Sequence, residues 1–274
     1  VQFLIVPVQA ADPVPANGQT AVSLDPTVSW SAGRGAVSHD LYVSDDPIAV
    51  GDETIDPIAV GLTDTTYDLA GLDVNTVYYW KVNEVGDTEA WSGNVWSFTT
   101  QDYLVLDDFE SYNDIPVGEE GSNIIYVTWA DGFDNPTVNG STVGHFEAFQ
   151  PTMETEIVRG GSQSMPIYYD NSVASVSEAK RTYAEAQDWT QAGATSIVLH
   201  YRFGADSVGQ ELYVKINDVK VAAVAVAVTE DWNPITIDLI GAGIDPTQVS
   251  SMTIGIDGAG ATGIVYVDDK MLMN

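Results

Sequence analysis

The fold class follows from the stretch Val77-Tyr78-Tyr79-Trp80-Lys81-Val82, which consists almost entirely of β-branched and aromatic residues. Such residues are enriched in strands, where they pack well on a pleated surface. Similar short runs occur on either side, at residues 28–30, 39–44, 66–69 and 95–100. Turn residues separate the runs about every 8 to 12 residues and helical periodicity is missing, which indicates an antiparallel β-sandwich.

Four motifs of this first segment carry a resemblance to a known family. They are Pro13-Val14-Pro15-Ala16-Asn17-Gly18, Val28-Ser29-Trp30, the stretch from Leu72 to Val82, and Trp96-Ser97-Phe98-Thr99-Thr100. Residues 12–100 resemble a fibronectin type III domain. The resemblance implies that Trp30 fills the core, that Leu72 and Tyr78 form the corner before the sixth strand, and that the domain spaces or joins other domains.

The second segment, residues 103–274, starts after the two-residue linker Gln101-Asp102 and again predicts short strands, one of them at residues 124–129. The only candidate for a short helix is residues 176–186. Residues 221–228 are apolar and uncharged, so this strand is expected to be central or covered, because an exposed edge without charge invites pairing with another chain.

The resemblance of this segment rests on its opening, centre and close. These are Leu106-Asp107-Asp108-Phe109-Glu110, Gly161-Ser162-Gln163-Ser164-Met165-Pro166 and Val265-Tyr266-Val267-Asp268-Asp269. They resemble the galactose-binding-like jelly rolls, which include many carbohydrate-binding modules. The sequence therefore predicts an all-β protein of two β-sandwiches, a fibronectin type III-like one followed by a jelly-roll-like one.

The charge balance narrows the partners of the protein. The 274 residues include 40 acidic and 9 basic ones, for a formal net charge of −31, and no cysteine. Phosphate backbones and anionic membrane surfaces would repel such a chain, so we expect no nucleic-acid partner. No run approaches the roughly 20 apolar residues of a membrane span, so no membrane insertion is expected.

Residues 1–11 form an apolar N-terminal arm with two interpretations. Val8-Gln9-Ala10 fits the small-x-small rule of a signal cleavage site, so the arm could be the tail of a signal peptide. Alternatively it is a retained strand whose side chains Phe3, Leu4, Ile5, Val6 and Val8 join a sheet of its own or a neighbouring subunit. Both interpretations predict a secreted protein, extracellular or on the cell surface.

The jelly-roll resemblance also implies a structural calcium ion shared by acidic residues at the two ends of the domain. The candidates are Asp107, Asp108, Glu110, Asp268 and Asp269. Carboxylate oxygens are the ligands that Ca²⁺ prefers, but an Asp pair at a strand end is more often simply solvated.

Sugar binding would need flat aromatic faces and a few fixed polar groups. The aromatic candidates are Trp129, Tyr168, Tyr169, Trp189 and Trp232, of which we select Trp129, Tyr169 and Trp189 together with the polar Asp131 and Asn135. Gly132 and Pro136 mark a loop in which Trp129 would be exposed. The competing interpretation places these aromatics in the core, where sandwiches commonly bury them.

Markers of catalysis are missing. His39, His145 and His200 are each isolated in the sequence, and no nucleophile elbow, phosphate-binding loop or zinc-protease motif occurs. We therefore expect that the protein is not an enzyme. A pair of carboxylates such as Glu154 and Glu156 could still serve a glycoside-active enzyme, which stays an alternative.

The sequence thus favours a non-catalytic extracellular structural or adhesive protein, a filament subunit whose arm adds a strand to a second copy. The alternative is a carbohydrate-binding module with its spacer domain, whose partner is a surface glycan.

Overall fold

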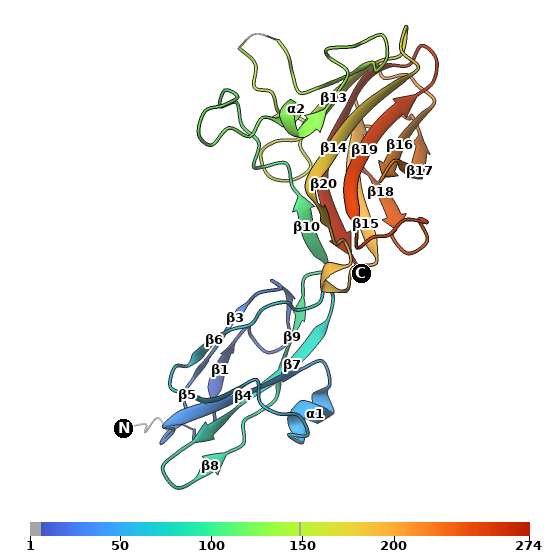
Figure 1. The fold of residues 1–274 in the computed structure, drawn as a ribbon. Helices are drawn as coiled ribbons and strands as arrows, with labels where there is room; N and C mark the ends of the chain where they lie inside the picture. The colour runs from blue at the N-terminus through green and yellow to red at the C-terminus, as the bar shows by residue number, and fades with distance from the viewer. Residues whose placement is uncertain (1–6, 148) are drawn as a thin grey trace. The chain divides into compact units, whose positions relative to one another are not determined.

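The computed structural model describes residues 7–147 and 149–274 and is all-β (Figure 1). The chain divides into two compact units, the first ending at Tyr103 and the second running from Leu104 to Met273. Within the described residues, no helix is long and apolar enough to cross a membrane.

The first unit contains two sheets and one short helix. The smaller sheet has the order β1 (Ala11–Val14), β3 (Thr27–Ser31), β6 (Thr66–Asp68). The larger sheet has the order β2 (Gln19–Val22), β9 (Trp96–Thr100), β7 (Val77–Val85), β4 (Ser38–Ser44), β5 (Ala59–Leu62), with β8 (Ala90–Trp91) paired to β7. Helix α1 (Pro47–Gly51) begins after Asp46, whose side chain accepts hydrogen bonds from the backbone N–H groups of Ile48 and Ala49.

The core of the first unit lies between its two sheets. Trp30 is buried there, as the resemblance implied, and the rings of Trp80 and Trp96 lie 4.8 Å apart. The hydroxyl of Tyr78 accepts a hydrogen bond from the backbone N–H of Asp73 at 3.2 Å, which ties down the corner before β7. Membership of the fibronectin type III family stays a prediction.

The second unit also has two sheets. One has the order β12 (Ser141–Val143), β13 (Met165–Asp170), β20 (Thr262–Met273), β15 (Ser196–Phe203), β18 (Asn233–Asp238), with β10 (Tyr103–Asp107) paired to β20. The other has the order β11 (Trp129–Ala130), β14 (Val176–Gln187), β19 (Val249–Asp257), β16 (Glu211–Ile216), β17 (Val219–Ala225). Two short helical turns complete it, α2 (Ile125–Thr128) and η1 (Gln191–Gly193).

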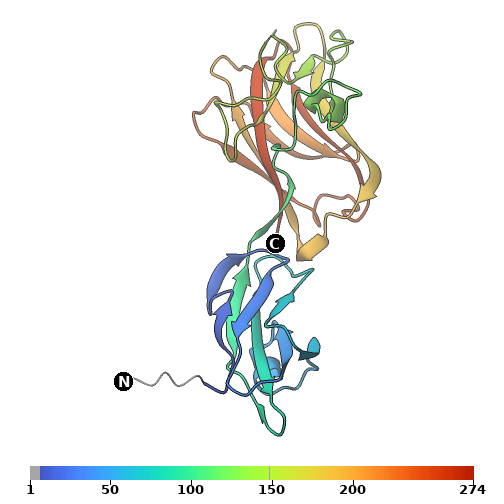
Figure 2. The ribbon, with the colours of Figure 1, turned by 90° about the vertical axis from the view of Figure 1, so that its left-hand side faces the viewer.

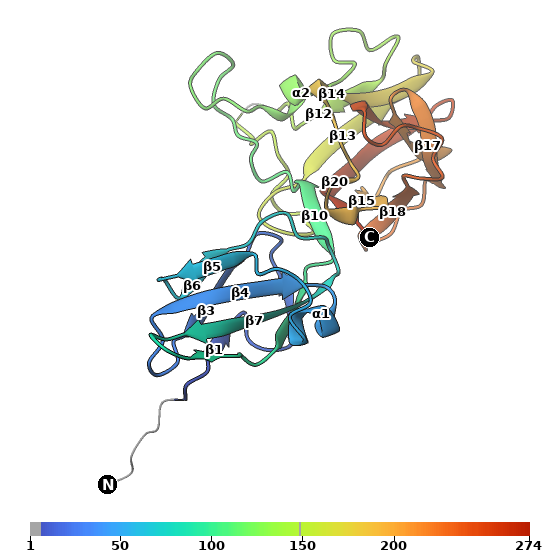
Figure 3. The same cartoon turned by 60° about the horizontal axis from the view of Figure 1, so that its bottom comes forward.

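The two sheets can be followed in the ribbon of Figure 2. Buried residues of both sheets belong to one hydrophobic core. In β15, Ile197, Leu199 and Phe203 are buried in the core, whereas His200 and Arg202 are half-buried on the other face. Alternate residues of a strand point to opposite faces, so these two polar side chains lie on the outer face of the sheet. Long loops between β10 and β13 extend beside α2 (Figure 3).

Three expectations about local structure are wrong. Residues 125–128 form helix α2 rather than part of a strand, and residues 176–186 belong to strand β14 rather than a helix. The uncharged run at residues 221–228 is not covered, because β17 ends its sheet, paired with β16 on one side within the described residues, and Ala223 and Ala225 are exposed. The order of strands in a sheet depends on distant partners, which the run itself does not encode.

The arm is described only from Pro7 onward, so Phe3, Leu4, Ile5 and Val6 lie outside the described residues. The carbonyl of Pro7 accepts a hydrogen bond from the backbone N–H of Arg34 at 2.7 Å, and Ala10 is buried in the core. Val8 runs so close to Gly33 that a Cβ there would lie 2.0 Å from the Val8 carbonyl oxygen. Residues 7–10 therefore pack on their own unit.

Candidate functional site

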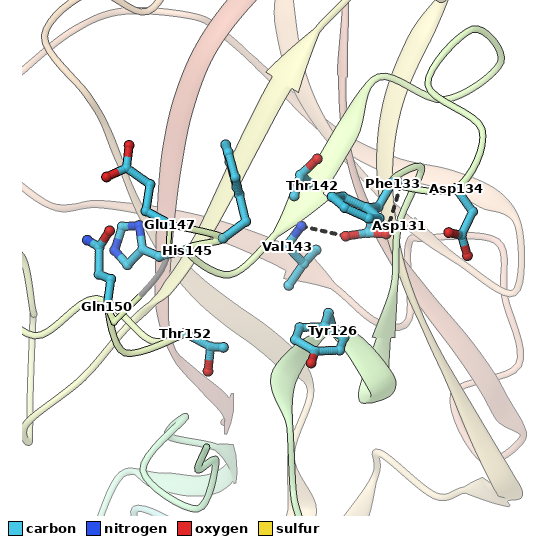
Figure 4. Close-up of a pocket in the computed structure, with 11 residues that line it drawn as sticks. Tyr126, Asp131, Phe133, Asp134, Thr142, Val143, His145, Glu147, Gln150 and Thr152 are labelled. Carbon is cyan, nitrogen blue, oxygen red and sulfur yellow. Dashed lines mark hydrogen bonds between the residues drawn. The ribbon is translucent and has the colours of Figure 1, made fainter. Parts of the chain in front are cut away.

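The second unit has a hollow of about 560 Å³ between its loops (Figure 4). The wall includes α2, the loop between β11 and β12, and the start of the loop between β12 and β13. The lining residues are Tyr126, Asp131, Phe133, Asp134, Thr142, Val143, His145, Phe146, Glu147, Gln150 and Thr152. We call it the loop hollow.

Exposed aromatic side chains gather at the loop hollow. Tyr126, Phe133 and Phe146 line it with 44%, 64% and 61% of their surface exposed, and Phe149 nearby is fully exposed. Among the described residues, the only other exposed aromatic side chain is Tyr103. Aromatic side chains that are exposed to solvent contribute little to the core. A cluster of them is typical of a binding surface.

The sequence ties the loop that carries Phe133 to the sheet. Both carboxylate oxygens of Asp131 accept backbone hydrogen bonds, one from Phe133 at 3.1 Å and one from Val143 at 2.6 Å. Gly132 lies against the next turn, since a Cβ there would be 1.8 Å from the carbonyl oxygen of Asn139. These backbone contacts fix the position of Phe133, although its ring is not buried.

His145 lines the loop hollow and is fixed by two neighbouring side chains. Its ring is buried, with Nδ1 2.7 Å from the Tyr168 hydroxyl and Nε2 3.2 Å from a carboxylate oxygen of Glu154. Burial alone would raise the pKa of Glu154, but backbone N–H groups of Glu156 and Ile157 and the contact with His145 bring that pKa below its usual range. Glu154 is therefore a charged anchor for His145.

Tyr168 lines a second hollow, of about 470 Å³, on the outer face of the sheet that contains β13, β20 and β15. We call it the sheet-face hollow. Tyr168 and Tyr266 line it from β13 and β20, and Arg202 lies opposite Tyr266 on β15. The pKa of Tyr168 is raised by burial and then by the charges of Glu147 and Glu154, so the phenol stays protonated at neutral pH.

The two hollows meet at one aromatic pair. Phe146 lines the loop hollow, Tyr168 lines the sheet-face hollow, and their ring centroids lie 5.1 Å apart at an interplanar angle of 69°. An edge-to-face pair of this kind fixes both rings relative to each other. Aromatic surface therefore continues from one hollow into the other.

Arg202 is one of three basic residues, with Arg34 and Lys270, that form no ion pair within the described residues, and it is the one that lines a hollow. Six of the nine basic side chains form ion pairs with carboxylates, namely Lys81, Arg159, Lys180, Arg181, Lys215 and Lys220. Arg202 forms none within the described residues, although the chain carries 40 acids. Its guanidinium is available to a ligand in the sheet-face hollow.

One of the predicted ligand-binding residues lines the loop hollow. Asp131 lines it and supports the loop, and Asn135 is exposed farther along the same loop without lining the hollow. The selection of Trp129, Tyr169 and Trp189 is wrong, because these rings are 0%, 2% and 0% exposed and belong to the core.

Sequence reasoning missed Tyr126, Phe133, Phe146 and Arg202, and it chose the wrong member of the Tyr168–Tyr169 pair. Phe133 had a usable signal, since it follows Gly132 within the turn-rich run that ends at Pro136. Phe146 lies between charged or polar neighbours, which offered only a weak signal of exposure. Tyr169 is buried in the core and Tyr168 lines the sheet-face hollow, because consecutive residues of a strand point to opposite faces of the sheet.

The predicted calcium ligands do not form one site. Asp107 pairs with Arg181, and Glu110 accepts hydrogen bonds from the backbone and hydroxyl of Ser162. Asp108 accepts the backbone N–H of Glu110 at 3.1 Å. Each carboxylate is thus engaged by a donor of the chain itself.

The same holds at the other end of the unit. Asp268 is fully buried and accepts backbone hydrogen bonds from Arg159 and Gly160, while Asp269 pairs with the Arg159 guanidinium. Across the described ranges, no group of three or more His, Asp or Glu residues is arranged to hold a metal ion. Calcium binding itself stays a prediction.

Each histidine contacts a different acceptor or carboxylate, and the three lie in separate places of the described chain. His39 pairs with the buried Glu84 in the first unit, His145 with Glu154, and the Nδ1 atom of His200 lies 3.3 Å from the carbonyl oxygen of Asp269. Glu154 uses its oxygens to hold His145 and the following backbone. The absence of catalysis stays a prediction.

No family model matches the chain, and a search of curated proteins also finds no match. Among solved structures, the chain is 13% identical to the family 11 carbohydrate-binding module of the cellulosomal cellulase Lic26A-Cel5E of Clostridium thermocellum, over 63% of this chain and 94% of that one, with a TM-score of 0.37. An exo-β-agarase is 12% identical over 64% of this chain and 25% of that one, with a TM-score of 0.43. The K2 cleaved adhesin domain of Lys-gingipain is 11% identical over 63% of this chain and 98% of that one, with a TM-score of 0.38. Likenesses this distant assign no ligand to this chain.

Proposed function

We propose that the second unit is a non-catalytic carbohydrate-binding module and that a glycan binds in the loop hollow. The observation that carries the proposal is the cluster of exposed aromatic rings, Tyr126, Phe133 and Phe146, around one hollow. Sugar rings have apolar faces that stack on such side chains. The Gln150 amide would donate to and accept from sugar hydroxyl groups, and the Thr152 hydroxyl, which donates to Asp114 at 2.6 Å, would accept from one.

The ligand is a linear oligosaccharide rather than a single sugar. The contact between Phe146 and Tyr168 joins the two hollows, and Tyr266 and Arg202 continue the surface across the sheet. A chain of several sugars could therefore rest on successive rings, while Arg202 donates to its hydroxyl oxygens.

The first unit fits the role of a spacer, with residues 12–100 as a fibronectin type III-like domain and residues 103–274 as the jelly-roll-like binding domain. The glycan partner then places the protein outside the cell or on its surface.

Calorimetric titration with a panel of soluble polysaccharides tests the proposal. We expect Phe133→Ala and Phe146→Ala each to weaken binding about tenfold, because each removes a stacking face. Phe149→Ala is the matched control, since this ring is fully exposed but does not line the hollow. Equal affinity of all three variants and the parent protein, or no binding to any glycan, would refute the proposal.

A second candidate function, self-assembly by strand addition, is favoured by the uncovered edge of β17. Residues 221–228 carry no charge, and such an edge offers backbone groups to an extended apolar segment. Because residues 7–10 pack on their own unit, the donated segment of a second copy would be residues 1–6, with Phe3, Leu4, Ile5 and Val6.

Light scattering across a concentration series tests this second candidate. Ala223→Lys should reduce self-association because it places a charge on the edge strand. Thr182→Lys, an exposed position on the inner strand β14, is the control. A monomer at all concentrations, or unchanged assembly after deletion of residues 1–6, would exclude strand addition.

A further inference from the structure

The loop hollow is lined by acids without any basic residue. Asp131, Asp134 and Glu147 line it, and neither Lys nor Arg does. Asp131 uses both oxygens to hold the backbone of its own loop. Asp134 and Glu147 lie on opposite sides of the hollow in Figure 4, and neither side chain accepts a hydrogen bond from another described residue. Two carboxylates thus remain for a ligand.

Like the carboxylates, the aromatic rings favour a positively charged ligand. The faces of Phe133, Phe146 and Tyr126 carry negative potential, so a cation held above them is attracted. The net charge of −31 adds a field that concentrates cations and repels anions near the surface. A uronic acid or a sulfated sugar would have to lose water next to Asp134 and Glu147 without gaining a basic partner.

Building on the proposed glycan binding, we propose that the loop hollow selects amino sugars with free amines, a polymer of glucosamine type, over uronic-acid and sulfated glycans. An ammonium group on a sugar stacked against Phe133 would pair with Asp134 or Glu147 through a charge-assisted hydrogen bond. The preference belongs to the loop hollow, because the sheet-face hollow contains both Arg202 and Asp206 and is balanced in charge.

Calorimetric titration with four oligosaccharides of equal length tests the inference. They are oligomers of glucosamine, N-acetylglucosamine, glucose and galacturonic acid, titrated at slightly acidic pH and low salt so that the amines are protonated. We expect the glucosamine oligomer to bind about tenfold more tightly than the acetylated one, and the galacturonic acid oligomer to bind most weakly of the four. High salt should narrow the difference, because it screens exposed charges.

The double variant Asp134→Asn/Glu147→Gln should reduce the preference for glucosamine to less than about twofold while the neutral oligomers bind as before. The matched control is Glu230→Gln/Asp231→Asn, which removes two exposed charges of the same unit outside the hollow.

Each outcome decides a different point. Equal binding of the glucosamine and acetylated oligomers, or an equal loss of preference in the control, overturns the amine inference and leaves glycan binding intact. Absence of binding by all four oligosaccharides overturns this inference, whereas absence of binding by the whole polysaccharide panel as well overturns the proposed glycan binding.

Discussion

Lys270 is the most unusual single residue of the second unit, because a lysine is fully buried among aromatic rings. Its Nζ lies 5.6 Å from the ring centroid of Trp129, 5.7 Å from that of Tyr183 and 6.0 Å from that of Trp189. A bulge places it there, since the single residue Leu199 of β15 faces both Asp269 and Lys270 of β20. Burial lowers the pKa of Lys270 to about 7, while the charge of Asp107 opposes that shift.

This pKa predicts how stability depends on pH. An unfolded lysine has a pKa of about 10.4, so between the two values the unfolded chain binds more protons than the folded one, and stability rises with pH. Lys270→Met should remove this rise and increase the melting temperature by about 5 °C near pH 6, with a smaller gain near pH 9.5. Calorimetry at the two pH values measures it, with the exposed Lys180→Met as control; an identical gain at both would contradict the account.

The carboxylates assigned to calcium make a second prediction at this scale. A bound Ca²⁺ at Asp268 and Asp269 would have to replace the backbone donors and the Arg159 guanidinium that now hold them. We therefore expect the melting temperature to be the same in millimolar Ca²⁺ and in chelator. A clear rise with Ca²⁺ that Asp269→Asn abolishes would restore the calcium site.

At the scale of elements, the five-stranded sheet depends on a glycine paired with a tyrosine. Tyr213 of β16 lies opposite Gly255 of β19, and its ring covers the glycine, with the hydroxyl donating to Glu178 at 2.6 Å. A Cβ at position 255 would lie 2.4 Å from the Tyr213 ring. The hydroxyl contact holds the ring in place, so the strand pair has little room to adapt.

Gly255→Ala should therefore destabilise the second unit by about 2 kcal/mol, through overpacking between paired strands. Urea unfolding followed by tryptophan fluorescence measures the change. Gly51→Ala serves as control, because a Cβ at this position meets no atom within 4 Å. An unchanged unfolding midpoint for Gly255→Ala would mean that the ring of Tyr213 yields freely.

Local sequence patterns predicted some of the helices and strands correctly and others wrongly. β15 and β7 are rich in β-branched and aromatic residues, and the sequence predicted both strands. Residues 124–129 read equally well as strand or helix because short apolar runs lack a clear period, and the chain forms α2 there. Residues 176–186 are rich in Ala and Glu, yet pairing with β19 makes them a strand.

At the scale of the whole molecule, the chain has two separate hydrophobic cores. One contains residues between Ala10 and Phe98, and the other contains residues between Phe109 and Leu272. Each core is closed by its own pair of sheets. A unit with its own core is able to fold alone.

Scanning calorimetry should therefore resolve two unfolding transitions in the full chain. A fragment of residues 104–274 should reproduce the transition of the second unit within about 3 °C and keep the same glycan affinity. The Phe133→Ala fragment is the matched control for binding. Failure of the fragment to fold would show that the first unit contributes to the second core.

By itself, the sequence determined the all-β class, the absence of cysteine and the charge of −31. These follow from composition and from alternation between neighbours in the chain. Only the tertiary structure decided that Trp129 and Trp189 are buried while Phe133 and Phe146 are exposed, and that β17 is an edge. The physical reason is that exposure depends on which distant segments pack over a residue, and that information lies in strand order and loop path rather than in any local pattern.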